Sequence, residues 1–156
     1  MATEHIYRYL EASHYRPGAG LGLATAGGRE PHPFFFRGFV DHPDQVARGV
    51  LAVAEVARTR YFDTGAGERM RDPVVTSNRS VLRIEAFSAC NGVYARLDLD
   101  DAGFDSEWID WGTTNVDVNE PLRAAVTGVA AGDPLRLSVG SDELHVETLD
   151  GPVVER

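Results

Sequence analysis

The sequence contains one cysteine, Cys90, and no apolar run that approaches the about 20 residues of a membrane span. A single cysteine excludes an internal disulfide, which fits a reducing compartment. The first residues, 1–5, show neither the basic stretch nor the following apolar stretch of a signal peptide. We therefore expect a cytoplasmic protein that makes no membrane contact.

Positive charge is also scarce. Lysine and arginine together number 15 against 24 aspartates and glutamates, which gives a net charge of −9. This balance excludes a protein that coats nucleic acid or anionic lipid over its whole surface. It leaves a local basic face open, so the positions of the cations matter more than their total.

Two loop motifs with known chemistry are incomplete. Glycines at 18, 20 and 22 suggest a phosphate loop, but the Lys-Ser/Thr of a nucleotide-binding loop does not follow them. A calcium loop starting at Asp98 needs an oxygen ligand at its fifth position and glutamate at its twelfth, where this chain has Ala102 and Ile109. We expect a structural loop and a solvated acidic segment instead.

No catalytic or metal-binding constellation can be assembled from the sequence. A nucleophilic Cys90 would need a nearby base, and Ser88 lacks the G-x-S-x-G context of an esterase. Zinc sites usually show paired ligands at tight spacing. The histidines do not provide it; they are His5, His14, His32, His42 and His145. We therefore predict a structural Cys90, no metal, no cofactor and no enzymatic activity.

The chain presents the same strand, turn and strand pattern twice. Residues 72–88 and 133–150 each begin with Asp-Pro, continue with a short apolar run and a polar turn, and end in an alternating strand. In the second strand of each block, Leu82 and Ile84 or Leu144 and Val146 share one face. An internal repeat is therefore expected.

A helix pattern precedes each block. Asp41 and Asn119 each stand two residues before a proline, which is typical of a helix cap followed by a proline in the first turn. The apolar spacing predicts helices over residues 43–61 and 121–131. The second is the weaker, because Gly128 lies inside it.

These patterns predict a single α+β domain over residues 1–156. It comprises a loop-rich segment at 1–33, a first strand-helix-strand-strand repeat at 34–98, an acidic connector at 99–111 and a second repeat at 112–156. A Gly-rich, charged loop is expected at 62–71, and residues 151–156 read as the start of an edge strand.

Several stretches resemble the N-terminal region of actinobacterial SWIM zinc finger family proteins. They are residues 36–39, 72–76, 82–88, 92–98, 112–119, 133–140 and 148–151. The family pattern has two adjacent cysteines where this chain has Cys90-Asn91. With one cysteine the chain cannot build the Cys-x-Cys and Cys-x-His finger, so zinc binding does not carry over.

The duplicated order of elements also resembles the repeat of DNA sliding clamps, the processivity fold. That resemblance implies helices on one side of a mostly antiparallel sheet, and a helical surface that faces double-stranded DNA. The residues that would meet phosphate are then Arg48, Arg58 and Arg123, which lie on the expected helices. Three arginines are few for electrostatic tracking of DNA, and a shared fold does not establish a shared function.

Three functional hypotheses follow. The first is a non-catalytic clamp-like domain that binds DNA, protein partners or both within a larger assembly. The second is a protein-interaction or regulatory module of a SWIM-type protein, which self-associates or binds proteins without contacting DNA. The third is an enzyme of unrecognised type.

Overall fold

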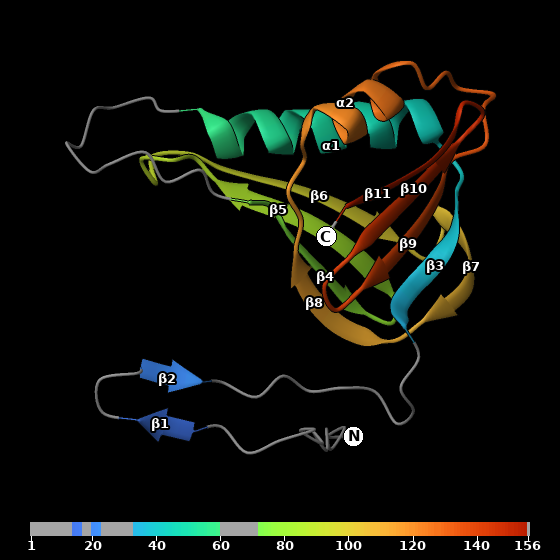
Figure 1. Ribbon diagram of the computed structural model, residues 1–156. Coiled ribbons are helices and arrows are strands. Elements are labelled where there is room, and N and C mark those ends of the chain that lie inside the picture. Colours follow the sequence, from blue (N-terminus) through green and yellow to red (C-terminus); the bar gives the residue numbers. More distant parts are fainter. Residues whose placement is uncertain (1–13, 17–19, 23–32, 60–71, 156) are drawn as a thin grey trace.

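The computed structural model describes residues 14–16, 20–22, 33–59 and 72–155, and its main body is two antiparallel sheets beneath two helices (Figure 1). The elements in chain order are β1 His14–Arg16, β2 Gly20–Gly22, β3 Phe34–Val40, α1 Pro43–Arg58, β4 Val74–Asn78, β5 Val81–Phe87, β6 Tyr94–Asp100, β7 Phe104–Ile109, β8 Trp111–Asn115, α2 Glu120–Thr127, β9 Arg136–Gly140, β10 Leu144–Thr148 and β11 Gly151–Glu155. The predicted α+β class is confirmed.

The two large sheets share strands between the halves of the chain. One sheet has the order β11-β10-β9-β3-β7 and the other has the order β6-β5-β4-β8. Strand β3 thus leaves its own half and pairs with β9, whereas β8 pairs with β4 of the first half. The order β3-α1-β4-β5-β6 recurs as β8-α2-β9-β10-β11, and each repeat donates its first strand to the sheet of the other.

A close contact joins the two sheets where β8 passes β3. The ring of Phe35 lies against the backbone of Gly112, so closely that a Cβ on Gly112 would stand 2.2 Å from Phe35 Cγ. Thr114 of β8 also donates a hydrogen bond at 2.7 Å to the carbonyl of Ser141 in the turn after β9. Glycine at 112 therefore leaves the space that the Phe35 ring occupies between the two sheets.

Strand β7 lies inside the segment 99–111 that the sequence presents as an acidic connector. It pairs with β3, and the register shifts between Arg37 and Gly38. The shift interrupts the alternation, and Phe104 is the one residue of the strand that is buried. This corrects the expectation of a connector without a strand. The period-2 signal is missing because the bulge and the solvated outer face remove it.

Helix α1 begins at Pro43, as predicted, but Asp41 does not cap it. His42 occupies the cap position without a side-chain cap bond, and its carbonyl accepts the N–H groups of Gln45 and Val46 at 3.1 and 3.0 Å. Asp41 is exposed and donates its backbone N–H to Gly103 in the turn after β6. The prediction of an Asp41 cap is therefore wrong. The helix ends at Arg58, before the expected Tyr61, which lies outside the described residues.

Helix α2 is capped by Asn119, as predicted: the side chain accepts the N–H of Leu122 at 3.1 Å. The helix ends at Thr127, well before the expected residue 131. Thr127 donates its hydroxyl to the carbonyl of Arg123, and Gly128 follows as the C-cap. Glycine is a poor continuation of a helix, so α2 stops there.

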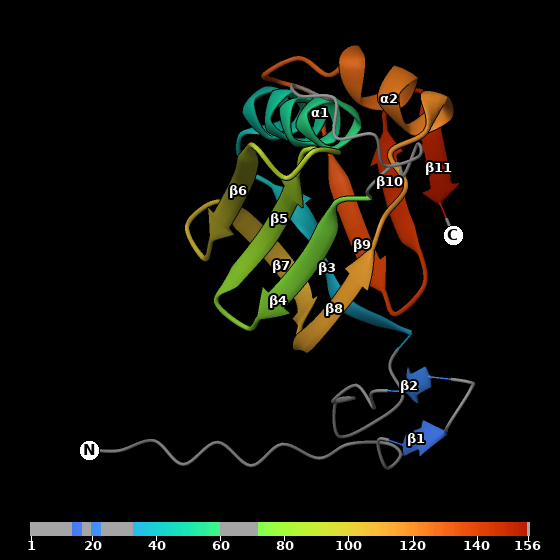
Figure 2. The ribbon, with the colours of Figure 1, turned by 90° about the vertical axis from the view of Figure 1, so that its left-hand side faces the viewer.

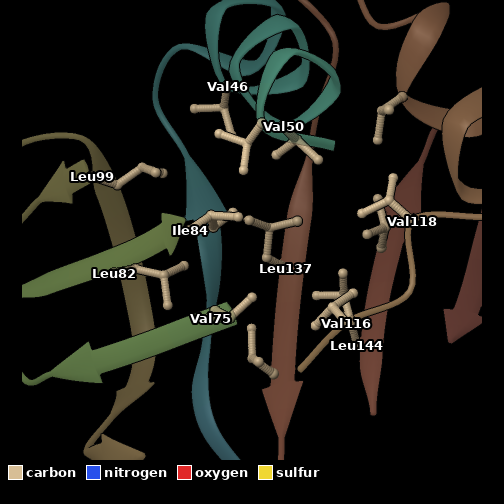
Figure 3. Packing of buried hydrophobic residues seen from close by; sticks show 14 of the residues in the cluster. Val46, Val50, Val75, Leu82, Ile84, Leu99, Val116, Val118, Leu137 and Leu144 are labelled. Carbon is tan, nitrogen blue, oxygen red and sulfur yellow. The ribbon is translucent and has the colours of Figure 1, made fainter. Parts of the chain in front are cut away.

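The hydrophobic core lies between the two sheets and the underside of the helices. Val46 and Val50 point from α1 toward Ile84 and Leu137, which come from different sheets (Figure 3). Phe36 is fully buried, and its ring meets that of Phe104 edge to face with centroids 5.1 Å apart. One hydrophobic core therefore contains residues from both repeats.

Outside this body, β1 and β2 form a two-stranded antiparallel sheet within the segment expected to be loop. Gly20 and Gly22 belong to β2, so these two glycines of the suspected phosphate loop are strand residues. The expected loop at 62–71 lies outside the described residues. The expected edge strand at the end of the chain is confirmed as β11.

Candidate partner-binding surface

The helices α1 and α2 lie side by side on one face of the molecule and form what we call the helix layer (Figures 1 and 2). Helix α1 buries seven residues beneath it and α2 buries two. The opposite sides of both helices carry charged side chains. The layer is thus a surface formed by both repeats, on which a partner could contact both helices together.

The three arginines expected to meet DNA all belong to this layer, at two separate places. Arg58 at the end of α1 and Arg123 of α2 lie where the helices meet. Arg48 lies earlier on α1, about 15 Å from Arg58 by the helical rise. The structure therefore brings two of the three arginines together.

Each of these arginines is paired with a carboxylate of the same layer. Arg48 binds Asp44 at 2.6 Å along α1. Two further pairs bridge the helices: Arg58 to Glu120 at 3.5 Å and Arg123 to Glu55 at 2.9 Å. The bridging pairs hold α2 against α1, and a phosphate would have to compete with carboxylates for the same N–H groups.

The pairing leaves the helix layer electrically balanced. Helix α1 carries Asp44 and Glu55 against two arginines, and α2 carries Glu120 against one. Arg48 remains 68% exposed, whereas Arg123 is only 19% exposed and its Nη1 is buried without a hydrogen-bond partner among the described residues. Arg48 is therefore the most accessible of the three cations to a large anion.

A second charged cluster lies on the outer face of the five-stranded sheet. Arg136 of β9 stands between Glu107 of β7, at 2.6 Å, and Glu147 of β10, at 3.3 Å. Its guanidinium also lies over the ring of Phe39, 5.6 Å from the centroid. The hydrogen bonds with Glu107 raise the pKa of Arg136. The sequence did not indicate this cluster, because its residues are far apart in the chain and become neighbours only when the strands pair.

The outer face of the four-stranded sheet has a similar pair. Arg83 of β5 donates hydrogen bonds to both carboxylate oxygens of Asp98 on β6, at 2.8 and 3.1 Å. Arg96 forms an ion pair with the same carboxylate at 3.3 Å. The hydrogen bonds from Arg83 lower the pKa of Asp98. Tyr94 donates its hydroxyl to Glu85, and this bond raises the tyrosine pKa. Both arginines of this face therefore lie against a carboxylate.

Exposed aromatic residues gather at the end of β5 and the start of β6. Phe87 is 50% exposed and Tyr94 is 45% exposed, and their rings pack with centroids 4.9 Å apart. The turn between them contains Asn91 with φ of 57°, a left-handed conformation that asparagine tolerates. Aromatic side chains of this kind are frequent in protein contacts. The alternating pattern did not single them out.

The same turn contains Cys90, whose thiol lies 3.5 Å from the hydroxyl of Ser88. Ser88 is fully buried, and its hydroxyl accepts the N–H of Val93 across the turn. This hydrogen bond stabilises the turn. The backbone of this turn contacts the C-terminal end of α1 through Ala89 and Thr59. His42 lies at the other end of α1, about 24 Å away by the helical rise, too far to act as a base for Cys90.

The described residues contain no group of three or more His, Cys, Asp or Glu side chains placed to hold a metal ion. Within the same ranges, no helix has the length and apolar character needed to cross a membrane.

Comparison with known proteins gives matches among solved structures. No family model and no curated protein matches the sequence. PCNA from Thermococcus kodakaraensis superposes with a TM-score of 0.56 at 19% identity, over 87% of this chain and 53% of that chain. A DnaN sliding clamp from Bartonella birtlesii bound to griselimycin gives 0.53 at 14%, over 77% and 29%. The DNA polymerase III subunit beta from Pseudomonas aeruginosa gives 0.51 at 12%, over 86% and 35%.

The fold is similar to that of the matched part of a DNA sliding clamp. The predicted resemblance to the processivity fold is thereby confirmed at the level of architecture. At these identities the comparison establishes the fold alone, and the chain spans about half or less of each matched protein.

Proposed function

We propose that the chain is a non-catalytic, sliding-clamp-like domain that acts within a larger assembly, with its helix layer turned toward double-stranded DNA or a protein partner. The observation that supports this is the position of both helices on one face, with Arg48, Arg58 and Arg123 among their charged residues. A function of this kind needs a surface and no reacting group.

The second candidate is a protein-interaction module without DNA contact, as the resemblance to SWIM family proteins implies. It is favoured by the three ion pairs in the helix layer, which leave no net positive charge there. DNA binding depends strongly on the release of counterions by unpaired cations. A balanced layer is better suited to a protein surface of mixed charge than to a phosphate backbone.

The two candidates differ in how the helix layer should respond to charge changes. Titration of labelled duplex DNA at low salt should show binding in the micromolar to millimolar range for the unmodified chain, the range of nonspecific contacts. Arg48→Glu/Arg58→Glu/Arg123→Glu should abolish it. Circular dichroism would establish that the variant keeps its fold.

A variant that is expected to bind DNA more tightly gives a more decisive test than the loss of binding. Asp44→Asn/Glu55→Gln/Glu120→Gln removes the carboxylates that hold the three arginines. If the layer meets DNA, this variant should bind more tightly, with a steeper salt dependence, because the guanidinium groups are released to phosphate.

A matched variant separates the layer from overall charge. Asp101→Asn/Asp105→Asn/Asp150→Asn removes the same number of exposed carboxylates from the ends and edge of the sheets. Equal tightening by both triple variants would show a general charge effect and would count against the helix layer. Absence of binding by every variant would favour the protein-interaction module.

A further inference from the structure

The asparagines of the chain differ in what their side-chain amides do. Asn78 accepts three hydrogen bonds in the turn after β4, from the N–H and hydroxyl of Ser80 and from the N–H of Val81. Asn119 accepts the N–H of Leu122 as the cap of α2. Loss of ammonia from asparagine requires the next backbone nitrogen to reach the side-chain carbonyl carbon. An amide that is held by hydrogen bonds in a turn or a cap is therefore protected.

Asn115 is protected in a different way. It is the last residue of β8 and pairs with Val74 of β4. The nitrogen that would attack its amide belongs to Val116, whose N–H donates to the carbonyl of Pro73 at 2.9 Å. Valine is also branched at Cβ, which crowds its own nitrogen. The reacting nitrogen is thus both hydrogen-bonded and hindered.

Asn91 has neither kind of protection. It lies in the turn between β5 and β6 and is followed by Gly92, and both residues are exposed. Among the residues that the structure describes, no hydrogen bond involves the Asn91 side-chain amide or the Gly92 N–H. Glycine has no Cβ, so its nitrogen is the least hindered of any residue type. The two reacting groups are both free and both in water.

The turn is held by Ser88 without using either of these groups. The N–H of Ser88 donates to the carbonyl of Val93 at 2.8 Å, and its hydroxyl accepts the N–H of Val93 at 3.0 Å. Its carbonyl accepts the backbone N–H of Asn91 at 2.8 Å. The Asn91 side chain and the Gly92 N–H therefore remain available although the turn is ordered.

We propose that Asn91 is a site of spontaneous deamidation in the folded chain. The Gly92 nitrogen gives its proton to hydroxide and attacks Cγ of Asn91, which forms a C–N bond and closes a succinimide ring. The bond from Cγ to the amide nitrogen breaks, and that nitrogen takes up a proton from water and leaves as ammonia. Water then opens the ring. Hydrolysis at Cγ gives aspartate, and hydrolysis at the backbone carbonyl gives isoaspartate, in which the chain runs through Cγ.

The isoaspartate product would change the shape of the turn. Its backbone contains one more carbon, which lengthens the path between the ends of β5 and β6. The exposed rings of Phe87 and Tyr94 pack together across these ends. In the same turn, the N–H of Ala89 donates to the carbonyl of Thr59 at the end of α1 (Figure 1). The modification therefore acts on an exposed aromatic pair and on a contact with the helix layer, whatever that layer binds.

Peptide mapping by mass spectrometry tests the proposal on the full chain during incubation in native buffer. Replacement of the amide by a carboxylate should be at least about tenfold faster at Asn91 than at Asn78, Asn115 or Asn119, a difference of about 1.4 kcal/mol in activation free energy. The rate at Asn91 should rise with pH, because the Gly92 nitrogen must lose its proton. A rate at Asn91 no higher than that at Asn115 would overturn the proposal.

The same measurement in urea separates the structure from the local sequence. Unfolding breaks the hydrogen bonds of Asn78 and Asn119, so both should react faster in urea than in native buffer. The rate at Asn91 should differ by less than about tenfold between the two conditions, because its reacting groups are already free. Stronger protection of Asn91 in native buffer would mean that the turn prevents ring closure, and would contradict the proposal.

Gly92→Ala is a matched variant that places a methyl group beside the attacking nitrogen. Gly92 does not have a positive φ, so its backbone conformation accepts alanine. Deamidation at Asn91 should slow in this variant, and the rate at Asn115 should stay unchanged. An unchanged rate at Asn91 would show that the Gly92 nitrogen is not the attacking group.

Thiol labelling of Cys90 in reducing buffer, after removal of the reductant, reports the change in the turn. Cys90 is only partly exposed, and a thiol reacts according to its access as well as its pKa. Chains with isoaspartate, recognised by an isoaspartyl methyltransferase and labelled S-adenosylmethionine, should react faster at Cys90 than fresh chains. Asn91→Gly suits the φ of 57° and cannot deamidate, so its labelling should not change with incubation. Equal labelling of fresh and isoaspartate chains would refute the effect on the turn.

Discussion

The two repeats have the same order of elements but stabilise their helices differently. Helix α1 has 16 residues and buries seven of them, and it begins without a side-chain cap. Helix α2 has eight residues, buries Leu122 and Val126, and begins with the Asn119 cap. A long amphipathic helix is held by packing along its length, whereas a short one depends on its ends and on few anchors. The duplicated fold therefore uses two ways of holding a helix on a sheet.

The largest expected effect comes from the anchor of the short helix. Leu122 is fully buried, and Leu122→Ala should lower the free energy of unfolding by about 2–5 kcal/mol. Val50→Ala shortens one of the seven buried side chains of α1. The loss of its buried methyl groups should lower the free energy of unfolding by about 2 kcal/mol or less. Urea unfolding of both variants measures the difference. A larger loss for Val50→Ala would reverse the comparison.

A smaller effect is expected at the helix starts. Asn119→Ala removes the side-chain bond to the N–H of Leu122 and should cost about 1 kcal/mol. Asp41→Ala should leave stability within about 0.5 kcal/mol, because Asp41 is exposed and its side chain does not cap α1. Thermal unfolding of the pair provides the measurement. Equal destabilisation would mean that Asp41 contributes to α1 after all.

The smallest effect concerns two carboxylates brought together where β4 pairs with β8. Burial, and next the charge of Asp117, raise the pKa of Asp72. A raised folded pKa means that the folded chain holds this proton more tightly, so stability declines as pH rises from the unfolded to the folded value. Asp72→Asn should stabilise the chain by up to about 0.5 kcal/mol at pH 7 and have no effect at a pH below both values. Chemical denaturation at the two pH values tests this, and equal effects at both would rule out the proton linkage.

Local sequence patterns predicted the repeated order of strands and helices. Apolar and polar residues alternate in the strands that became β5 and β10, and Asn119 is a residue type that strongly favours a helix cap. The two wrong predictions also have local causes. A bulge hides β7, and Asp41 has the residue type of a cap but is held against the turn after β6 by its backbone. Asn and Asp also cap turns and loops, so residue type alone does not distinguish these cases.

The surface could be predicted only in part. The positions of Arg48, Arg58 and Arg123 on helices followed from periodicity, but their partners did not. Arg123 and Glu55 are 68 positions apart, and Arg136 and Glu107 are 29 apart. Such pairs depend on which strand lies beside which, and no short sequence window contains that information. The balance of charge in the helix layer was therefore a finding of the structure.

The exchange of first strands has a consequence for synthesis of the protein. Strand β3 is made early, yet its neighbours in the sheet are β7 and β9, and the pairing of Phe39 with Arg136 spans most of the described chain. In the nascent chain, the aromatic residues of β3 therefore remain unpaired with their neighbouring strands until the second half of the chain has left the ribosome. Contacts of such long sequence separation slow folding. Folding on the ribosome should accordingly wait for β9, and a chaperone would find β3 uncovered during that interval.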